Sequence, residues 1–179
     1  MLNHKGTETI YTERLVLRQY KLSDAKCMYK NYAGDERVTK FLLWEPYKND
    51  EETKPYLQSI ISQYKNQNVY EWAIEYQRES IGGISAMSVN DIWKNCEVGY
   101  CIGYDYWNQG IASEALAAVI KFMFDEVRLH RIMAKHNEKN PASGKVMKKC
   151  HMNCEGRMKE YYVNRDGMYS DCLVYGIVC

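Results

Sequence analysis

Residues 96–124, with the sequence CEVGYCIGYDYWNQGIASEALAAVIKFMF, decide the fold. From Cys96 to Ile102 apolar residues occupy every second position, which is the period of a β-strand. After Gly110 apolar residues recur three and four positions apart as far as Phe124, which predicts an amphipathic helix. The polar turn 108–110 leaves the first backbone N–H groups of that helix free, and a helix N-terminus carries roughly half a positive charge. We therefore expect an anion site here and interpret it as the cradle for the pyrophosphate of a cofactor.

The composition is that of a soluble globular protein. Of the 179 residues, 46% are hydrophobic and 26% are charged, and this length predicts one domain over residues 1–179. A net charge of +1 gives no electrostatic reason to expect nucleic acid or an anionic membrane as a partner. The polar N-terminus lacks the apolar core of a signal peptide, and no run approaches the roughly 18 apolar residues of a membrane span. We expect a cytoplasmic protein.

We do not expect a disulfide framework, because the seven cysteines are an odd number and are scattered along the chain. Cys150, His151 and Cys154 stand close enough to suggest metal ligands. No second pair is spaced to complete a tetrahedral site, so we expect small buried thiols and no metal.

Strand and helix signals alternate along the whole chain. They predict strands over residues 12–20, 69–76, 80–89, 92–103, 129–135, 158–163 and 170–178. They predict helices over residues 24–32, 50–65, 110–124 and 140–150, and an irregular segment over residues 34–50. Strands before, between and after helices imply one mixed sheet that is covered on both faces.

These segments resemble a known family. The run EVGYCIGYDYWNQGIASEAL, residues 97–116, is similar to the acetyl-CoA-binding core of the GCN5-related N-acetyltransferases, the GNAT superfamily, and especially to its ribosomal-protein alanine N-acetyltransferase branch. TERLVLRQYKLSDA (12–25) and HRIMAKHNEKNPASGKVMKKC (130–150) are similar to other parts of that branch, so nearly the whole chain is covered. The resemblance implies an α+β fold of α/β/α layers, with a mixed, mostly antiparallel twisted sheet of about seven strands and about four helices. It also implies acetyl-CoA as co-substrate.

The family's phosphate loop, Gln/Arg-x-x-Gly-x-Gly/Ala, is matched by residues 107–112, with Trp107 at the first position. Because such a loop acts mainly through backbone N–H groups, we expect cofactor binding to survive this departure. The alternative from the residues alone is a plain helix start after a strand. The resemblance implies the following cofactor-binding residues: Cys101, Ile102, Trp107, Asn108, Gln109, Gly110, Ile111, Ala112, Ser113, Asn140 and Ser143.

The resemblance places Glu97 at the family's position for a general base that acts through water. The alternative from the residues alone is a solvated glutamate on a strand face. Deprotonating an α-amine of pKa about 7.7–8.0 at pH 7 costs about 1 kcal/mol, against roughly 4–5 kcal/mol for a lysine amine. A single water-relayed carboxylate therefore suits an α-amine better.

The acid for the leaving thiolate is harder to identify. Much of the superfamily carries a tyrosine seven residues after the helix-opening asparagine, and counting from Asn140 gives Met147, which cannot donate a proton. Ser143 is the substitute that we expect, and its alternative role is a first-turn helix serine that bonds local backbone. His151-Met152 replaces the family's Gly-Phe, and we expect His151 to be structural.

The acceptor is predicted less specifically than the cofactor. The resemblance implies an acceptor wall formed by Trp44, Tyr47 and the first two predicted helices, 24–32 and 50–65. The two aromatic side chains fit a peptide or an apolar-tailed amine, and a core cluster explains them equally well. The leading prediction is an N-acetyltransferase that acts by direct transfer on a protein N-terminal α-amine, as a monomer or homodimer. The alternatives are acetylation of a small amine, such as a polyamine or an aminoglycoside, and a non-catalytic acetyl-CoA-binding module.

Overall fold

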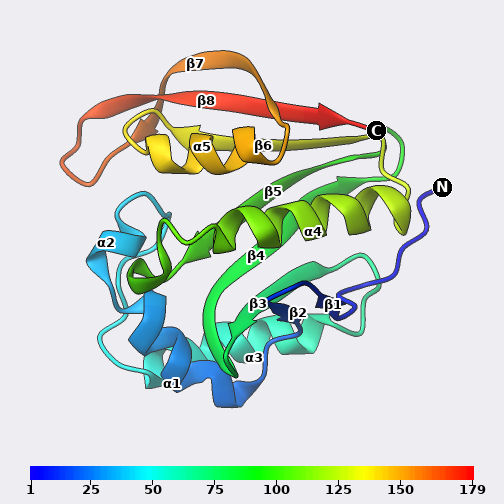
Figure 1. Ribbon diagram of the computed structural model, residues 1–179. Helices are drawn as coiled ribbons and strands as arrows, with labels where there is room; N and C mark the ends of the chain where they lie inside the picture. Colours follow the sequence, from blue (N-terminus) through cyan, green and yellow to red (C-terminus); the bar gives the residue numbers. More distant parts are fainter.

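One eight-stranded sheet runs through the chain, which the computed structural model describes over residues 1–179 (Figure 1). The strands are β1 (Ile10–Tyr11), β2 (Val16–Arg18), β3 (Tyr70–Tyr76), β4 (Glu79–Asn90), β5 (Asn95–Ile102), β6 (Arg131–Asn137), β7 (Asn153–Val163) and β8 (Tyr169–Val178). The helices are α1 (Ala25–Met28), which continues as a π-helical turn over Tyr29–Ala33, α2 (Glu36–Thr39), α3 (Lys54–Gln63), α4 (Ile111–Asp125) and α5 (Pro141–Lys149).

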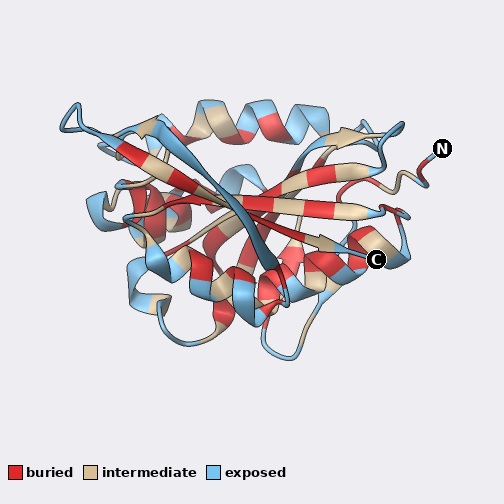
Figure 2. Ribbon diagram, turned by 90° about the horizontal axis from the view of Figure 1, so that it is seen from above, coloured by how far each residue is buried: buried red, intermediate tan, exposed pale blue.

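The sheet lies between two helical layers, as the view from above shows (Figure 2). On one face α4 and α5 cover a core of 27 buried residues, among them Leu17, Trp72 and Leu116. On the other face α1 and α3 cover a second core of nine buried residues around Tyr32 and Leu57. The predicted α+β layered fold is therefore confirmed, with one strand and one helix beyond the expected counts.

The strand order is β1-β2-β3-β4-β5-β6-β8-β7, and every neighbouring pair except β5–β6 is antiparallel. The parallel pair joins only Asn95–Glu97 to Arg131–Met133, and we call this short contact the parallel seam. Beyond it the two strands part, while β6 continues to pair with β8 as far as Asn137. The residues 98–102 of β5 and 134–137 of β6 therefore flank a gap in the sheet, which we call the β5–β6 opening.

The central prediction is confirmed, because β5 and α4 fall on the predicted strand and helix of residues 96–124. The predicted strand over residues 12–20 is shorter, only β2, and it forms a hairpin with β1, which the sequence did not reveal. The irregular segment 34–50 contains α2, whose N-cap Asp35 accepts a hydrogen bond from the backbone of Arg37. The strand predicted over 158–163 begins at Asn153 as β7, and the one predicted over 129–135 is shifted to β6.

No helix of this protein combines the length and the apolar character that a membrane crossing requires.

Candidate active site at the β5–β6 opening

The turn before α4 carries a row of free backbone donors. Asn108 and Gly110 adopt left-handed backbone conformations, with φ of 60° and 78°. None of the six backbone N–H groups of residues 108–113 donates to an acceptor in the protein, and the first intrahelical bond runs from Glu114 N to the Gly110 carbonyl. Successive free N–H groups at a helix N-terminus form a concave anion site. The predicted cradle over Asn108–Ala112, together with Ser113, thus offers free donors of the kind that a pyrophosphate needs.

A clamp from the N-terminal hairpin fixes this turn. Arg14 donates from Nε to Glu114 at 2.7 Å and from a terminal nitrogen to the Gln109 carbonyl at 3.0 Å. Thr12 donates its hydroxyl to the same carboxylate at 2.6 Å. Burial alone would raise the pKa of the Glu114 carboxyl, but the hydrogen bonds from Thr12 and Arg14 outweigh burial and hold that pKa below its usual value.

Trp107, the departure from the family pattern, has a structural role. Its indole Nε1 donates to the Ile102 carbonyl at 2.7 Å, and its ring lies 4.9 Å from that of Tyr104. The indole therefore ties the end of β5 to the start of the anion turn. It also occupies the carbonyl of Ile102, one of the cofactor-binding positions that the resemblance implies.

The open edge of β5 lies beside this turn. Gly83 and Gly82 of β4 pair with Cys101 and Ile102 on one side, and no strand pairs with residues 98–102 on the side of β6. An unpaired strand edge is a ready template for an extended ligand. The arrangement fits a cofactor with an anionic head at residues 108–113 and a peptide-like arm along β5.

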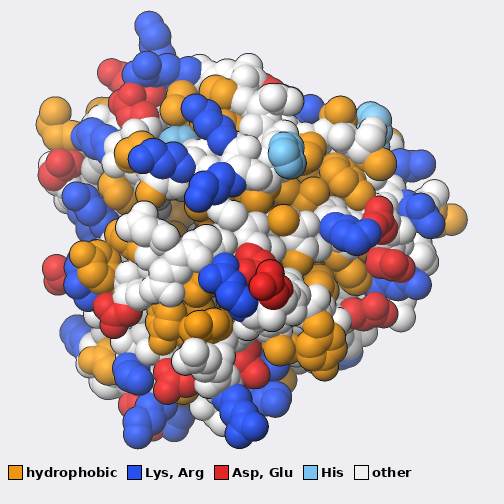
Figure 3. Space-filling model, in the orientation of Figure 1, with side chains coloured by type: hydrophobic (Ala, Val, Ile, Leu, Met, Phe, Trp, Pro, Cys, Tyr) orange, Lys and Arg blue, Asp and Glu red, His pale blue; other side chains and the backbone are white.

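Basic residues lie near the anion turn, although the net charge of the chain is only +1. The Cys150 thiol at the end of α5 donates to the Ser113 carbonyl at 3.2 Å, so the last turn of α5 is next to the first turn of α4. That last turn carries Lys148 and Lys149, which are exposed. Figure 3 shows lysine and arginine side chains gathered over α5 on this face of the molecule. Their charge favours an anionic ligand.

Glu97 stands on the other face of the sheet, on the side of α1 and α3. Its carboxylate forms an ion pair with the Lys135 ammonium at 3.1 Å, and Lys135 also donates to the Tyr161 hydroxyl at 3.1 Å. Burial would lower the pKa of Lys135, but Tyr161 and Glu97 outweigh it and raise that pKa, so the ammonium stays charged. The Glu97 side chain is 26% exposed and therefore within reach of water. Sequence reasoning found Glu97 but not its partner Lys135, nor the Tyr161 hydroxyl that Lys135 also contacts.

Ser143 in the first turn of α5 contacts Tyr100 of β5. The Tyr100 hydroxyl donates to the Ser143 carbonyl at 2.9 Å and lies 3.1 Å from the Ser143 Oγ. Burial raises the pKa of Tyr100 well above its usual value, so this phenol remains protonated. Tyr100 thus links β5 to the first turn of α5, a role that sequence analysis missed. Asn140, the N-cap residue of α5, makes no side-chain hydrogen bond there and is free to meet a ligand.

The remaining candidates divide between core and surface. Met147 is buried in the larger core, and His151 is exposed with φ of 61° after α5. Cys150 is buried while Cys154 is exposed, and no group of three or more potential ligands could hold a metal ion.

The predicted acceptor wall is tied to the opposite end of the chain. Trp44 and Tyr47 stack with ring centroids 5.6 Å apart and pack against the smaller core. Arg165, in the turn between β7 and β8, donates to the Thr39 and Trp44 carbonyls at 3.1 Å. The two rings therefore have a packing role, and they belong to a segment that the β7–β8 turn holds in place.

The chain belongs to the GNAT acetyltransferase family, because residues 14–153 match the profile described as "Acetyltransferase (GNAT) domain". It is 31% identical over 156 residues to an uncharacterized N-acetyltransferase p20 of Bacillus licheniformis, covering 86% of this chain and 87% of that one. It is 29% identical over 168 residues to the [ribosomal protein uS5]-alanine N-acetyltransferase of Escherichia coli K12, covering 89% and 85%. The structure of RimL, a ribosomal L7/L12 alpha-N-protein acetyltransferase in complex with coenzyme A, superposes with a TM-score of 0.85 at 25% identity, covering 96% of this chain and 98% of that one. The protein is therefore an N-acetyltransferase of this family.

Proposed function

We propose that this enzyme transfers the acetyl group of acetyl-CoA to the N-terminal α-amine of a protein. The observation that carries the proposal is the row of six free N–H groups at residues 108–113 beside the unpaired edge of β5. That pair of features suits a ligand with a pyrophosphate and an amide-bearing arm, which is the chemistry of coenzyme A. The acceptor class is supported by the ribosomal-protein acetyltransferases among the relatives.

The residues at the opening divide the work of a direct transfer. The acceptor nitrogen attacks the thioester carbonyl, the C–S bond breaks, and the products are an amide and the thiol of coenzyme A. Glu97 takes the proton of the amine through water, and Lys135 orients its carboxylate. The Ser143 hydroxyl, positioned by Tyr100, donates a proton to the leaving thiolate and recovers it from solvent. The residues 108–113, with Cys101 and Asn140, hold the donor substrate, and Trp107 fixes the end of β5 beside them.

The competing functions differ in what they require. A small-amine acetyltransferase needs no surface for a polypeptide. For a protein acceptor, our proposal uses as walls the 34–50 segment and the β7–β8 turn, which Arg165 joins. A non-catalytic acetyl-CoA-binding module needs neither Glu97 nor Ser143. Retention of both beside the opening favours an enzyme.

The decisive experiment follows release of the coenzyme A thiol from acetyl-CoA with N-terminal peptides, polyamines and aminoglycosides as acceptors. We expect peptides to be acetylated, and Glu97→Gln to lower kcat about 10²–10⁴-fold, which is the usual contribution of a general base. Glu13→Gln is the matched control, because Glu13 is exposed and its side chain has no partner. Thiol release with amines alone would establish the small-amine function. No release with any acceptor, while acetyl-CoA still raises the thermal stability, would establish the binding module.

A further inference from the structure

A cleft between α3 and the sheet has no assigned role. It has a volume of about 320 Å³ and lies between α3 and the strands β3 and β4. We call it the α3 cleft, and its principal lining residues are Tyr56, Ser59, Gln63, Glu71, Ser85 and Met87. No lysine, arginine or histidine lines it, so Glu71 is its one charged group.

The carboxylate of Glu71 lacks a cation. Its Oε1 accepts a hydrogen bond from the Tyr56 hydroxyl, and its Oε2 has no partner in the protein. Burial raises the pKa of this carboxyl, although the Tyr56 hydrogen bond offsets part of the rise. A partly buried carboxylate with one neutral donor and an open side is chemically suited to a cationic ligand.

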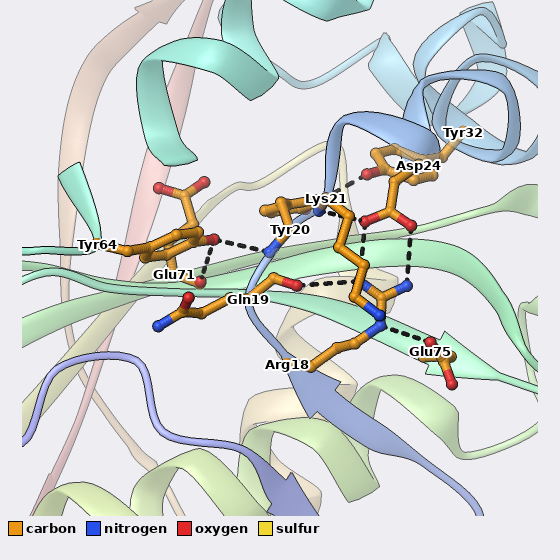
Figure 4. Close-up of polar contacts among 9 residues, drawn as sticks. All are labelled: Arg18, Gln19, Tyr20, Lys21, Asp24, Tyr32, Tyr64, Glu71 and Glu75. Atoms are coloured by element: carbon orange, nitrogen blue, oxygen red, sulfur yellow. Dashed lines mark hydrogen bonds and ion pairs between the residues drawn. The ribbon is translucent and has the colours of Figure 1, made fainter. Parts of the chain in front are cut away.

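The Arg18 guanidinium does not neutralise Glu71. Arg18 donates both terminal nitrogens to Asp24 at 2.8 Å and its Nε to Glu75 at 2.5 Å. Figure 4 shows the Glu71 carboxylate turned away from this group, with Tyr64 bound to the backbone carbonyl of Glu71. The Arg18 guanidinium is thus already paired with the carboxylates of Asp24 and Glu75.

The α3 cleft lies on the same face of the sheet as Glu97. Glu71 pairs with Ser85 across β3 and β4, and Ser85 pairs with Gly99 across β4 and β5, so all three share that face. Met87, which lines the cleft, pairs with Glu97 itself. Two strand spacings across the sheet and two residues along it place the Cα atoms of Glu71 and Glu97 roughly 12 Å apart.

We propose that the α3 cleft, through Glu71, binds a second cationic group of the acceptor: the lysine or arginine side chain of a residue at position two or three behind the reacting N-terminus. An extended peptide advances about 3.4 Å per residue, so such a side chain spans the distance from Glu97 to Glu71. This inference rests on the proposed function for the position of the reacting amine. It deepens that function by naming a substrate class.

The test uses pairs of N-terminal peptides that differ only by lysine or methionine at position two or three. With wild type and with Glu13→Gln, we expect kcat/KM to favour the lysine peptide by about 10- to 100-fold, which is the value of a charge-assisted hydrogen bond. With Glu71→Gln, the preference falls to within about threefold. Ser85→Lys, which places an ammonium beside an intact Glu71, abolishes it as well. Equal preference in wild type and Glu71→Gln would overturn the inference.

A binding measurement separates this inference from the proposed function. Fluorescence anisotropy of the same labelled peptides, with coenzyme A present, needs no turnover. Tighter binding of the lysine peptide to wild type but not to Glu71→Gln supports the cleft even if no acetylation occurs, in which case only the proposed function fails. Acetylation of both peptides at equal rates, with equal binding, leaves the proposed function intact and overturns the cleft. Glu71-dependent turnover of a linear triamine without any lysine-peptide preference also overturns it.

Discussion

Among single residues, Tyr100 and Ser143 form a contact that joins strand β5 to helix α5. The Tyr100 hydroxyl donates a hydrogen bond to the backbone carbonyl of Ser143 in the first turn of α5. It also lies within hydrogen-bond distance of the Ser143 Oγ. A serine hydroxyl rotates freely unless a neighbour fixes it. Tyr100 is therefore a positioning residue for the group that we expect to protonate the thiolate.

We expect Tyr100→Phe to lower kcat about tenfold and to leave the KM for acetyl-CoA within twofold, because the ring keeps its packing while Ser143 loses its partner. The stability loss should be about 1 kcal/mol for the hydrogen bond. Steady-state kinetics of Tyr100→Phe, Ser143→Ala and the double variant measure the coupling. If Tyr100 acts through Ser143, the double variant is no slower than Ser143→Ala.

Tyr76→Phe is the control for that cycle, since the Tyr76 ring packs against Tyr106 and its hydroxyl has no hydrogen bond in the protein. It should leave kcat unchanged. Fully additive losses in Tyr100→Phe and Ser143→Ala would show that Tyr100 has no connection with Ser143 in the reaction.

At the scale of elements, the strand–turn–helix unit depends on the left-handed backbone of Gly110. Any L-residue with a Cβ is strained at a φ of 78°, by roughly 1 kcal/mol for alanine. If the φ angle at position 110 changes to relieve this strain, the neighbouring N–H groups of Gln109 and Ile111 no longer point toward the same bound anion. The anion turn is thus sensitive to a single methyl group.

We expect Gly110→Ala to lower the melting temperature by about 2–4 °C and to weaken acetyl-CoA binding at least tenfold. Gly167→Ala is the matched control, because Gly167 has a φ of 77° and nothing within 4 Å of an added Cβ, in the turn between β7 and β8. It should cost the same stability and leave acetyl-CoA affinity unchanged by calorimetry. Equal affinity in both variants would contradict a role for the Gly110 backbone in the cradle.

Sequence periodicity predicted the elements that are long and the ones with one buried face. β5 and α4 follow it closely, because each has an apolar face against the larger core. α2 is one turn long and β1 has two residues, so neither contains a repeat that periodicity could detect. The start of β7 was missed because nearly all of this edge strand is exposed and it lacks a buried face.

The site residues divide in the same way. The anion turn and Glu97 belong to a continuous stretch, and the family resemblance supplied their expected roles. Tyr100, Lys135 and Glu71 were missed because the partner of each lies 15 or more residues away in the chain, on another strand or helix. A tyrosine at an apolar position of a strand is indistinguishable from a core residue until its hydroxyl partner, 43 residues away, is known.

In the complete fold, the two segments that we propose as walls of the acceptor site, residues 34–50 and the β7–β8 turn, lie far apart in the chain. Arg165 joins them through two carbonyls of the 34–50 segment and through Glu45 at 3.1 Å. Its side chain is 36% exposed, so the contribution of this ion pair to global stability is small. Its effect is instead to hold two otherwise separate segments in one arrangement.

We expect Arg165→Gln to raise the KM for the acceptor about tenfold and to change the KM for acetyl-CoA and the melting temperature little. Hydrogen exchange of residues 34–50 should become faster, because their carbonyls lose the guanidinium. Arg157→Gln is the control, since Arg157 pairs with Glu138 and Asp171 without contacting that segment. Unchanged exchange in Arg165→Gln would show that the segment is held by its own packing against the smaller core.

The parallel seam has a consequence for biosynthesis. Strands β1 to β5 are neighbours in the sheet in the order in which they are synthesised. The second edge of β5 is covered only after α4 and then β6 have been synthesised. The nascent chain therefore exposes a full strand edge for the time needed to translate about thirty residues, at a rate of roughly 5–20 residues per second. Through such an edge, two nascent chains on one polysome can form an incorrect intermolecular strand pair. In the completed enzyme residues 98–102 keep that edge permanently, so the same five residues are both a hazard of synthesis and the place where the donor substrate is expected to bind.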